Sequence, residues 1–465
     1  MERTAELLRS IDNLVWGPLM LVLMLGTGIY LTVKMRFLPI RNLGYALRSV
    51  MGFDSHTKEE GKGDISSFSS LMTELAATIG IGNIVGVATA MVLGGPGALL
   101  WMMLSAFVGF STKLAESLLS VKYRTVNDRG EISGGPMYTL SSAFPNKRIG
   151  KVLGFLFALF AVFASFGMGN MTQSNSISAA MYETFGISEG LTGLVVTILT
   201  ILVILGGIKS ISKITQVVVP CMAIFYLVGA LLVILVNIEN LPKGVWQILT
   251  MALSPKAMAG GAGGTIVVSM QQALRWGVSR GVFSNEAGLG AGGISAAAAN
   301  TDDPVKQGYV SMTGVFFDTI VICLVTGLAL AASGVLGITD ASGELVTGTA
   351  LTIAAFSTTF GHWGGYLVSI GIVLFAFATI IGWEYQGEKA FEFLVKKTKY
   401  CIVYRFVYAL VAFVGATCAL DVVWDFSDIM NAMMAVPNLI CVLVMSKTAC
   451  KEVFRYQEKI SKRKK

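Results

Sequence analysis

Long apolar runs alternate with short polar connections along almost the whole chain. A run of about 20 apolar residues is long enough to cross a bilayer as a helix. We predict such helices at about 14–33, 98–122, 151–182, 190–208, 213–236, 308–333, 364–396, 401–420 and 426–446. Two further apolar segments bring the expected number of spans to about eleven. The pattern therefore indicates an all-α polytopic membrane protein.

The two further segments, about 66–91 and 265–300, are interrupted by poor helix formers. The first contains Gly80, Gly82, Asn83 and Gly86, and the second is interrupted within 281–293. In lipid, an unwound helix exposes backbone N–H and C=O groups at a cost of several kcal/mol each. Such a break persists only where a polar group or an ion binds it. Two interrupted segments in corresponding halves of a chain therefore indicate the binding site of a transporter.

These patterns also predict the organisation of the chain. We expect an extra helix and a cytoplasmic loop (1–65), a five-helix repeat (66–236), an extracellular connection (237–264), a second, inverted five-helix repeat (265–446) and a basic cytoplasmic tail (447–465). Basic residues gather in alternate connections, which places the N-terminus outside and the C-terminus in the cytoplasm of a cell-membrane protein. The motif Ser133–Tyr138 is expected to form a re-entrant or interfacial turn.

Composition narrows the class of protein. Residues are 54% hydrophobic and 14% charged, with a mean hydropathy of +0.70, whereas an ordinary soluble domain has about 25% charged residues. The net charge of +7 follows membrane topology and does not indicate nucleic-acid binding. The six cysteines have no paired spacing, so neither a disulfide framework nor a metal site is expected. The chain lacks the rings of charge of a channel and the nucleophile–base pairs of an enzyme.

The first break offers both ends of a helix dipole to a ligand. N–H groups at the start of a half-helix attract a carboxylate, and carbonyls at the end of the preceding half-helix attract an ammonium or a small cation. We expect substrate contacts from Thr78, Ile79, Gly80, Gly82 and Asn83. The alternative is a glycine-rich face that only packs against another helix.

The second break carries an acid, Glu286, which must pair, hydrogen-bond or be protonated inside a membrane. Phe283 and Ser284 lie beside it as candidate substrate residues. Arg280 precedes them and is expected to pair with an acid at an outer gate, unless it extends to the interface. Glu74 is expected to join a cytoplasmic network, unless it is solvated at a helix end.

Two other helices carry polar stripes. Asn170 and Gln173 share a helical face, where they bind a substrate carboxylate or form hydrogen bonds between helices. Ala376, Thr379 and Ile380 also share a face, and oxygen donors there suit Na⁺ better than a softer metal.

Three motifs resemble the alanine or glycine:cation symporter family, the sodium:alanine symporters. They are 77–90 (ATIGIGNIVGVATA), 134–138 (GGPMY) and 281–290 (GVFSNEAGLG). The resemblance extends over nearly the whole chain and places it in the amino acid–polyamine–organocation superfamily. It implies a fold like that of the bacterial leucine transporter, with two inverted five-helix repeats and one extra helix.

The resemblance also implies roles for single residues. It places the backbone of Ala76 and Ile79 at a sodium site, opposite the face of Ala376, Thr379 and Ile380. The leucine transporter has a serine where Ile380 stands, so Ile380 offers at most its carbonyl. Pocket residues implied by the resemblance are Asn83, Gln173 and Trp383, with Phe166 as a gate.

These observations predict a symporter that imports alanine or glycine with Na⁺ by alternating access around the two broken helices. It needs no cofactor beyond the coupling ion. Its partners are the amino acid, Na⁺ and the bilayer. The alternatives are proton coupling or a glutamine substrate on the same fold and, from another class, an ion channel.

Overall fold

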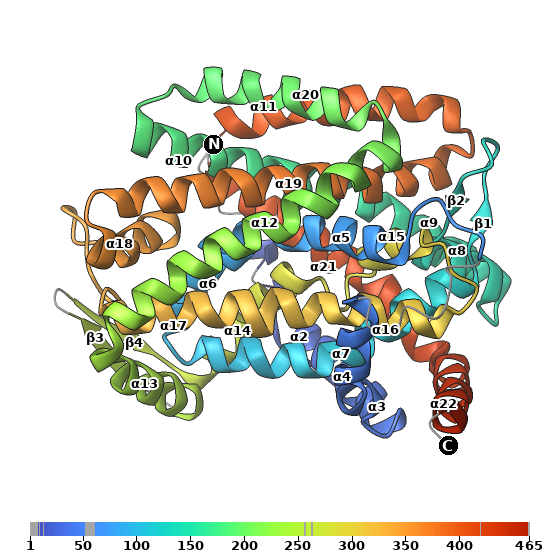
Figure 1. Cartoon of the computed structure of the whole chain (residues 1–465), viewed down its shortest axis with the longest axis horizontal. Helices are drawn as coiled ribbons and strands as arrows, with labels where there is room; N and C mark the ends of the chain where they lie inside the picture. Colours follow the sequence, from blue (N-terminus) through green and yellow to red (C-terminus); the bar gives the residue numbers. More distant parts are fainter. Residues whose placement is uncertain are drawn as a thin grey trace.

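The computed structural model describes residues 8, 10–12, 14–51, 61–254, 257–261, 264–418 and 420–463. Most of these residues form helices that run side by side (Figure 1). Parts of the predicted N-terminal unit (1–7 and 52–60) and the end of the predicted tail (464–465) lie outside the described residues.

The elements follow in chain order. They are α2 (Pro18–Lys34), α3 (Leu38–Arg41), α4 (Leu43–Val50), α5 (Ser67–Thr78), η1 (Ile81–Asn83), α6 (Val85–Leu93), α7 (Ala98–Lys122), β1 (Thr125–Val126), β2 (Ile132–Ser133), α8 (Pro136–Ala143), α9 (Lys147–Phe166), η2 (Gly167–Met171), α10 (Thr172–Phe185), α11 (Glu189–Ile204), α12 (Gly207–Val236), η3 (Ile238–Asn240), α13 (Leu241–Leu253), β3 (Ala257–Gly261), β4 (Gly264–Val268), α14 (Met270–Asn285), α15 (Ala291–Ala297), α16 (Pro304–Val315), η4 (Phe316–Cys323), α17 (Leu324–Ser333), α18 (Gly348–Phe360), α19 (Trp363–Val395), η5 (Thr398–Tyr400), α20 (Cys401–Thr417), α21 (Leu420–Val444) and α22 (Ser446–Arg463).

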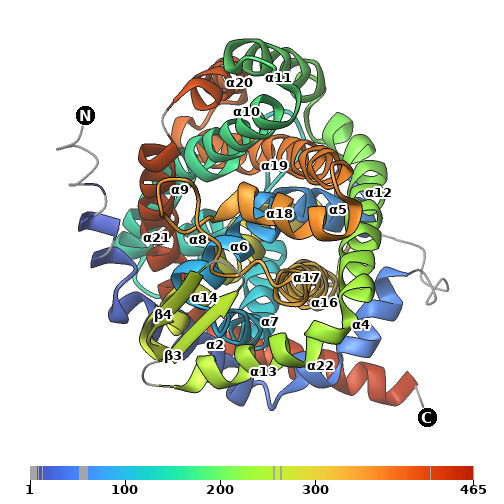
Figure 2. The same ribbon diagram turned by 90° about the vertical axis from the view of Figure 1, so that its left-hand side faces the viewer.

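The two interrupted segments lie at the centre of the bundle. Residues 277–299 are all buried, as are residues 70–88. Viewed along the helices, α5 and α6 are surrounded by α7, α9, α12, α19 and α21 (Figure 2). The broken segments therefore contact protein on all sides, as non-helical backbone at membrane depth requires.

The periphery of the bundle is apolar. On α11 and α12, Leu202, Ile224 and Leu235 each expose more than half of their surface, and Leu410 does the same on α20. A contiguous apolar exterior of this kind is suited to lipid chains rather than to water. By length and composition, seven of the described helices are suited to cross a membrane. Neither broken segment is among these seven, so the predicted count of eleven spans stays a prediction.

The connection between the halves contains more regular structure than expected. Within the predicted connection (237–264), α13 is followed by the hairpin of β3 and β4, in which Ala257 pairs with Val268. The predicted start of the second broken helix at 265 is therefore wrong, because residues 265–268 belong to β4 and the helix begins at Met270. Antiparallel pairing satisfies the backbone groups of this segment without a helix.

The glycine–proline motif at 134–138 begins a short helix rather than forming only a turn. Gly135 has φ +125°, a conformation that favours glycine, and Pro136 starts α8. A Cβ on Gly134 would lie 2.4 Å from the Cβ of Ala297. Because Gly134 has no side chain, the segment before α8 can pack directly on the end of α15.

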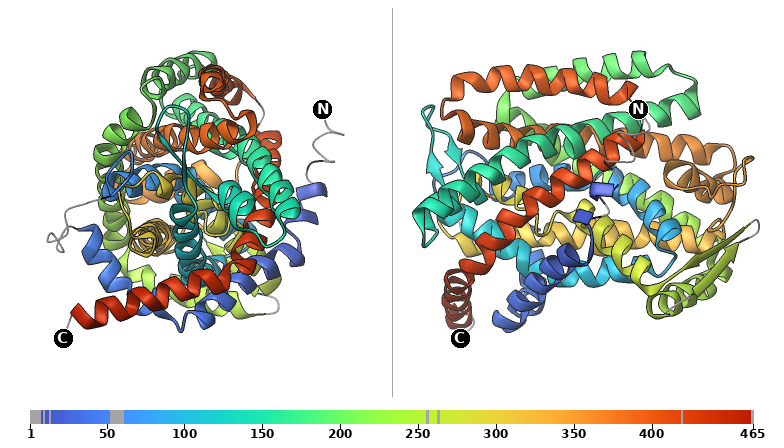
Figure 3. Two further views of the ribbon diagram at one scale, coloured as in Figure 1. Left: turned by 90° about the vertical axis from the view of Figure 1, so that its right-hand side faces the viewer. Right: turned by 180° about the vertical axis from the view of Figure 1, so that it is seen from behind.

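The tail forms helix α22, which lies along one edge of the bundle beside α3 and α4 (Figure 3). Asn42 donates a hydrogen bond to Gln457 at 2.7 Å, and Tyr45 is hydrogen-bonded to Tyr456 at 2.8 Å. The tail is therefore docked on the body of the protein along part of its length.

Close approach of α7 and α14 leads to a test of this packing. A Cβ on Gly277 would lie 2.3 Å from the carbonyl oxygen of Ala98, so Gly277→Ala forces two backbones apart. Overpacking of this kind costs about 1–3 kcal/mol, and thermal unfolding in detergent should begin at a lower temperature. Gly26→Ala is the matched control, since nothing lies within 4 Å of its added Cβ. An equal loss of stability in both variants would contradict the packing.

Candidate functional site

The first break replaces helical hydrogen bonds with bonds to side chains. Helix α5 ends at Thr78, and the chain is extended at Gly80 before η1 begins. The Gly80 N–H donates to Asn83 Oδ1 at 2.9 Å, and the Ile81 N–H donates to Gln173 Oε1 at 3.3 Å. The predicted break is thus present, although Gly86 lies inside α6 and does not interrupt it.

Gln173 reaches the break from α10, directly after the π-helical segment η2. Its side-chain amide donates to the carbonyl of Met168 at 3.1 Å, which directs the amide oxygen to the Ile81 N–H. A Cβ on Gly80 would lie 3.2 Å from that oxygen and 2.4 Å from Thr379 Oγ1. Gly80 therefore allows Gln173 and Thr379 to approach the same stretch of backbone.

Helix α19 faces the end of α5 as the sequence predicts. Thr379 Oγ1 lies 3.4 Å from the carbonyl oxygen of Ile79 and 3.1 Å from that of Phe375. Gly382 brings the helices together, because its added Cβ would lie 2.6 Å from the Ala77 nitrogen. The carbonyl of Ile380 accepts a hydrogen bond from Tyr408 at 2.9 Å.

The second break lies against the first. Helix α14 continues to Asn285, and the chain leaves it through Glu286 with φ +58°, so the break begins later than residue 281. A Cβ on Gly82 would lie 3.2 Å from the Cα of Ser284 and 3.3 Å from the ring of Phe283. The last turn of α14, which leads into the second break, is therefore in direct contact with the first break, and Gly82 is small enough to permit this.

Asp318 of η4 joins the two breaks, and our sequence reasoning missed it. Its carboxylate accepts hydrogen bonds from Asn83 Nδ2 at 2.7 Å, Ser284 Oγ at 2.9 Å and Thr319 Oγ1 at 2.7 Å. The signal was in the sequence, because Asp318 is the single charged residue in the apolar run 308–333. An acid inside a membrane helix is a candidate functional residue by default.

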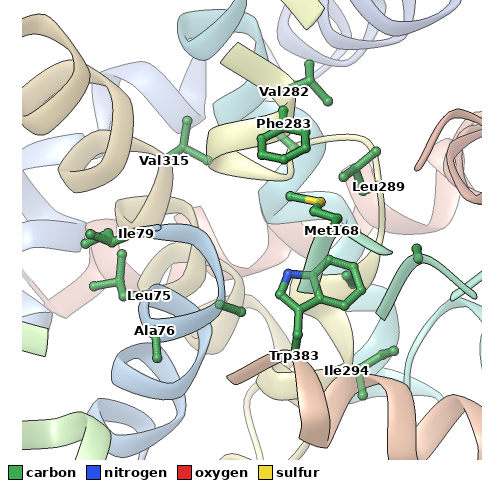
Figure 4. Packing of buried hydrophobic residues seen from close by; sticks show 14 of the residues in the cluster. Leu75, Ala76, Ile79, Met168, Val282, Phe283, Leu289, Ile294, Val315 and Trp383 are labelled. Carbon is green, nitrogen blue, oxygen red and sulfur yellow. The ribbon is translucent and has the colours of Figure 1, made fainter. Parts of the chain in front are cut away.

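Apolar side chains pack beside the breaks. Trp383 and Met168 lie on the side facing Phe283, with Ile79 and Leu75 of α5 opposite (Figure 4). The Trp383 side chain packs on Gly169, whose added Cβ would lie 2.4 Å from the Trp383 Cβ.

Two predicted residues are directed elsewhere. Phe166 packs on Tyr404 and Tyr408, with ring centroids 5.5 and 5.9 Å away. Asn170 donates to the carbonyl of Tyr408 at 2.6 Å. Both contacts are to α20, and so the structure does not bring these two side chains to the breaks. Asn170 instead matches the alternative of a hydrogen bond between helices.

One end of the bundle, here called the Arg280 end, is closed by a buried ion pair and aromatic rings. The Arg280 guanidinium binds both carboxylate oxygens of Asp428, at 3.2 and 2.7 Å. It also lies 5.0 Å from the ring centre of Trp424, which stacks on Phe283. Asp12 lies nearby, and burial together with repulsion from Asp428 raises the pKa of Asp12 to about 7.

The opposite end, here called the Arg124 end, is closed mainly by backbone contacts. The Arg124 guanidinium donates to the carbonyls of Ala297, Ala299 and Thr301 at 2.7–2.8 Å. Asp64 accepts a hydrogen bond from the Ile132 N–H at 2.9 Å, and burial raises the pKa of Asp64. Residues before α5 and after α15 are also joined directly, because the Asp64 N–H donates to the carbonyl of Ala298 at 2.9 Å and the Asn300 N–H to that of Ile65 at 2.7 Å.

A second ion-pair network lies beside it. Lys389 of α19 bonds Glu131 at 3.2 Å and Glu392 at 3.0 Å, and Glu392 accepts from Ser133 at 2.6 Å. With both ends held shut, the central site is enclosed.

The predicted network of Glu74 is buried rather than at a helix end. Glu74 pairs with Lys113 of α7 at 3.0 Å, and both side chains are almost fully buried. Glu116 and Glu286 are buried in the same region, and Glu116 accepts from Asn438 at 2.5 Å.

Comparisons of sequence agree over the full length of the chain. The profile of the family described as "Sodium:alanine symporter family" matches residues 1–465. The sodium/alanine symporter AgcS of Methanococcus maripaludis is 49% identical over 456 residues, which cover 97% of each chain. The probable sodium/glutamine symporter GlnT of Bacillus subtilis is 37% identical over 464 residues, covering 98% of this chain and 92% of GlnT.

Comparisons of structure show the fold. The crystal structure of MhsT in complex with L-phenylalanine matches with a TM-score of 0.57 at 12% identity, covering 84% of this chain and 99% of MhsT. A manganese transporter of Eremococcus coleocola matches with a TM-score of 0.51 at 11% identity, covering 84% and 81%. These similarities confirm the predicted leucine-transporter-like fold.

The hydrogen bonds around Asp318 lead to one prediction. Asp318→Asn replaces an acceptor oxygen with an NH₂ group that faces the donors of Asn83, Ser284 and Thr319. Since a hydrogen bond to a charged group contributes about 1.5–3 kcal/mol, thermal unfolding in detergent should begin at a lower temperature. Thr319→Val removes one donor and should have a smaller effect. If Asp318→Asn lowers the unfolding temperature no more than Thr319→Val does, the role of Asp318 in joining the two breaks is contradicted.

The Arg280 end gives a second prediction. Arg280→Ala leaves Asp428 buried without its partner, which typically costs about 3–5 kcal/mol. The double variant Arg280→Ala, Asp428→Ala removes both charges and should recover part of the loss in thermal stability. Additive losses in this double-mutant cycle would show that the two side chains are not coupled.

Proposed function

Because the chain belongs to the sodium:alanine symporter family, we propose that it transports alanine or glycine together with Na⁺ by alternating access. Family membership by itself supports Na⁺-coupled amino acid transport, and the family and its relatives are transporters rather than enzymes. The proposal that alanine or glycine moves with Na⁺ by alternating access rests on one observation. The two broken segments contact each other, and Thr379 faces the end of α5.

The sodium site of the proposal lies between α5 and α19. Its donors are the carbonyls of Ala76, Ile79 and Ala376 and the hydroxyl of Thr379. These are neutral oxygen atoms, which a small hard cation prefers. The distance of 3.4 Å between Thr379 Oγ1 and the Ile79 carbonyl oxygen supports their approach to one ion. The Ile380 carbonyl already accepts the Tyr408 hydroxyl, and so it is the weakest of the predicted ligands.

The amino acid of the proposal lies along η1. Its carboxylate takes the N–H groups of the break, which now bond to Asn83 and Gln173. Its side chain faces Trp383, Met168 and Phe283 (Figure 4). Phe283, Trp383 and Met168 are buried hydrophobic residues, which suit a methyl group better than a long polar chain, and this favours alanine or glycine over glutamine.

The different closures of the two ends support the proposal of alternating access. The Arg280 end is held by side chains of α14 and α21, whereas the Arg124 end is held by backbone carbonyls after α15. Each closure can open while the other stays shut.

For the orientation, we propose that the Arg124 end faces the cytoplasm of a cell membrane, with the N-terminus outside. Several basic residues gather at or near the Arg124 end, among them Arg129, Lys396, Lys397 and Lys399. Positive residues are enriched in cytoplasmic connections.

Thr379 provides the test of the coupling ion. Alanine binding to the purified protein is measured by calorimetry with and without Na⁺ at fixed ionic strength. In the wild type, Na⁺ should raise the affinity for alanine, and linkage then requires an equal effect of alanine on Na⁺. Thr379→Ala should reduce the Na⁺ effect about tenfold, in line with about 1.4 kcal/mol for one lost ligand.

Thr379→Ser keeps the hydroxyl and should preserve most of the Na⁺ effect. Uptake of alanine into proteoliposomes, driven by an imposed Na⁺ gradient, gives the second readout. Accumulation that ignores this gradient would overturn Na⁺ symport. Tighter binding of glutamine than of alanine or glycine would overturn the proposed substrate.

A further inference from the structure

Four ionisable side chains are buried together beside the two breaks. Glu74 comes from α5, Lys113 and Glu116 from α7, and Glu286 from the second break. Each exposes 2% of its surface or less. Gly292 of α15 permits the cluster, because its added Cβ would lie 2.3 Å from Lys113 Nζ and 2.7 Å from Glu74 Oε1.

The charges of this cluster do not balance. Among the residues that the structure describes, its one ammonium group, Lys113, is set against three carboxyl groups. Glu74 takes the ion pair with Lys113 at 3.0 Å, and Glu116 accepts the amide of Asn438 at 2.5 Å. Three ionised carboxylates would leave two uncompensated negative charges at membrane depth, which is very costly.

Glu286 differs from the other acids near the breaks because, in the described part of the chain, it has no ion pair and its one side-chain hydrogen bond is with the Trp383 indole. Asp318, by comparison, accepts from Asn83, Ser284 and Thr319 on its two oxygens. These donors replace the hydration that an ionised carboxylate requires. The ionised form of Glu286 would have one such donor, the Trp383 indole N–H, and would be poorly solvated.

The charged and polar groups that face Glu286 come from several elements. They are Glu74 of α5, Lys113 and Glu116 of α7, Asp318 of η4, and the indole N–H of Trp383 on α19. An ammonium and an N–H group repel a metal cation, and so this place suits a proton better than Na⁺.

We propose that the Glu286 carboxyl is a proton-binding site, and that the enclosed arrangement of the two breaks forms with this carboxyl neutral. Loss of the proton gives a carboxylate that competes with Glu74 for Lys113. Ser284 and Asn285 directly precede Glu286 in the chain. The Asn285 carbonyl lies 3.4 Å from Lys113 Nζ, and Ser284 donates a hydrogen bond to Asp318. Ionisation therefore displaces the backbone that carries Ser284, so protons promote amino acid binding. This inference rests on the proposed function.

The first experiment measures alanine affinity at saturating Na⁺ from about pH 6 to about pH 9, a range in which buried glutamate side chains have been found to titrate. The wild-type affinity should fall at high pH by up to about tenfold per pH unit, the limit for one linked proton. Glu286→Gln mimics the neutral acid, and its affinity should be nearly independent of pH. A flat wild-type profile, or an unchanged profile in Glu286→Gln, would overturn the proposal.

Two matched controls assign the effect to one carboxyl. Glu116→Gln makes the same change within the cluster, and Asp12→Asn makes it at the Arg280 end, where the pKa of Asp12 is about 7. Both variants should keep the wild-type fall in affinity at high pH. The assignment would be overturned if the alanine affinity of either control did not depend on pH while that of Glu286→Gln still fell at high pH. The proton would then bind to another group.

A measurement without substrate separates this proposal from the proposed function. Infrared difference spectra of wild type minus Glu286→Gln should contain the C=O stretch of a protonated carboxylic acid, which disappears as pH rises. Absence of this band at every pH would overturn the proton site even if Na⁺-coupled alanine binding is intact. A band without any alanine or glycine binding would overturn the substrate assignment and support the proton site.

Discussion

Backbone groups that leave a helix inside a membrane must find partners within the protein, and the centre of this fold is built around that requirement. At the first break, Asn83 and Gln173 accept the N–H groups that the helix no longer uses. Asp318 then fixes Asn83 and Ser284, so the two breaks share one acceptor. In the proposed function, a ligand that enters here would exchange hydrogen bonds instead of creating them, and the existing bonds keep the unwound backbone stable before the ligand binds.

Close helix contacts follow from the same requirement. Polar groups reach each other only if the helices that carry them approach closely, and Gly80, Gly82 and Gly382 leave room for this. An added methyl would overlap Thr379 at Gly80 and the Ala77 backbone at Gly382, and at Gly82 it would lie in tight contact with Ser284, 3.2 Å from its Cα. The abundance of glycine in this chain thus has a specific cause in the centre of the bundle, beyond general helix packing.

Three acids near the breaks show three ways of keeping a carboxyl group inside a membrane. Glu74 has an ion pair with Lys113, Asp318 has hydrogen-bond donors on both oxygens, and Glu286 has no ion pair and a single side-chain hydrogen bond, with Trp383, in the described structure. The first two arrangements replace the lost hydration of a charge, whereas the third favours a neutral acid. Acids of one chemical type thereby serve different purposes within one small region.

The sequence by itself determined the class of protein, the two interrupted helices and the family, because hydropathy and glycine-rich motifs are local properties of the chain. The family resemblance also implied that Thr379 lies opposite Ile79, and the sequence predicted that Arg280 pairs with an acid. It did not find Asp318, the hairpin of β3 and β4, or the direction of Phe166. Which polar groups meet across helices depends on rotation and register, which nonlocal packing sets. Only the tertiary structure therefore decided that Asp318 joins the breaks and that Glu286 is buried without an ion pair among the described residues.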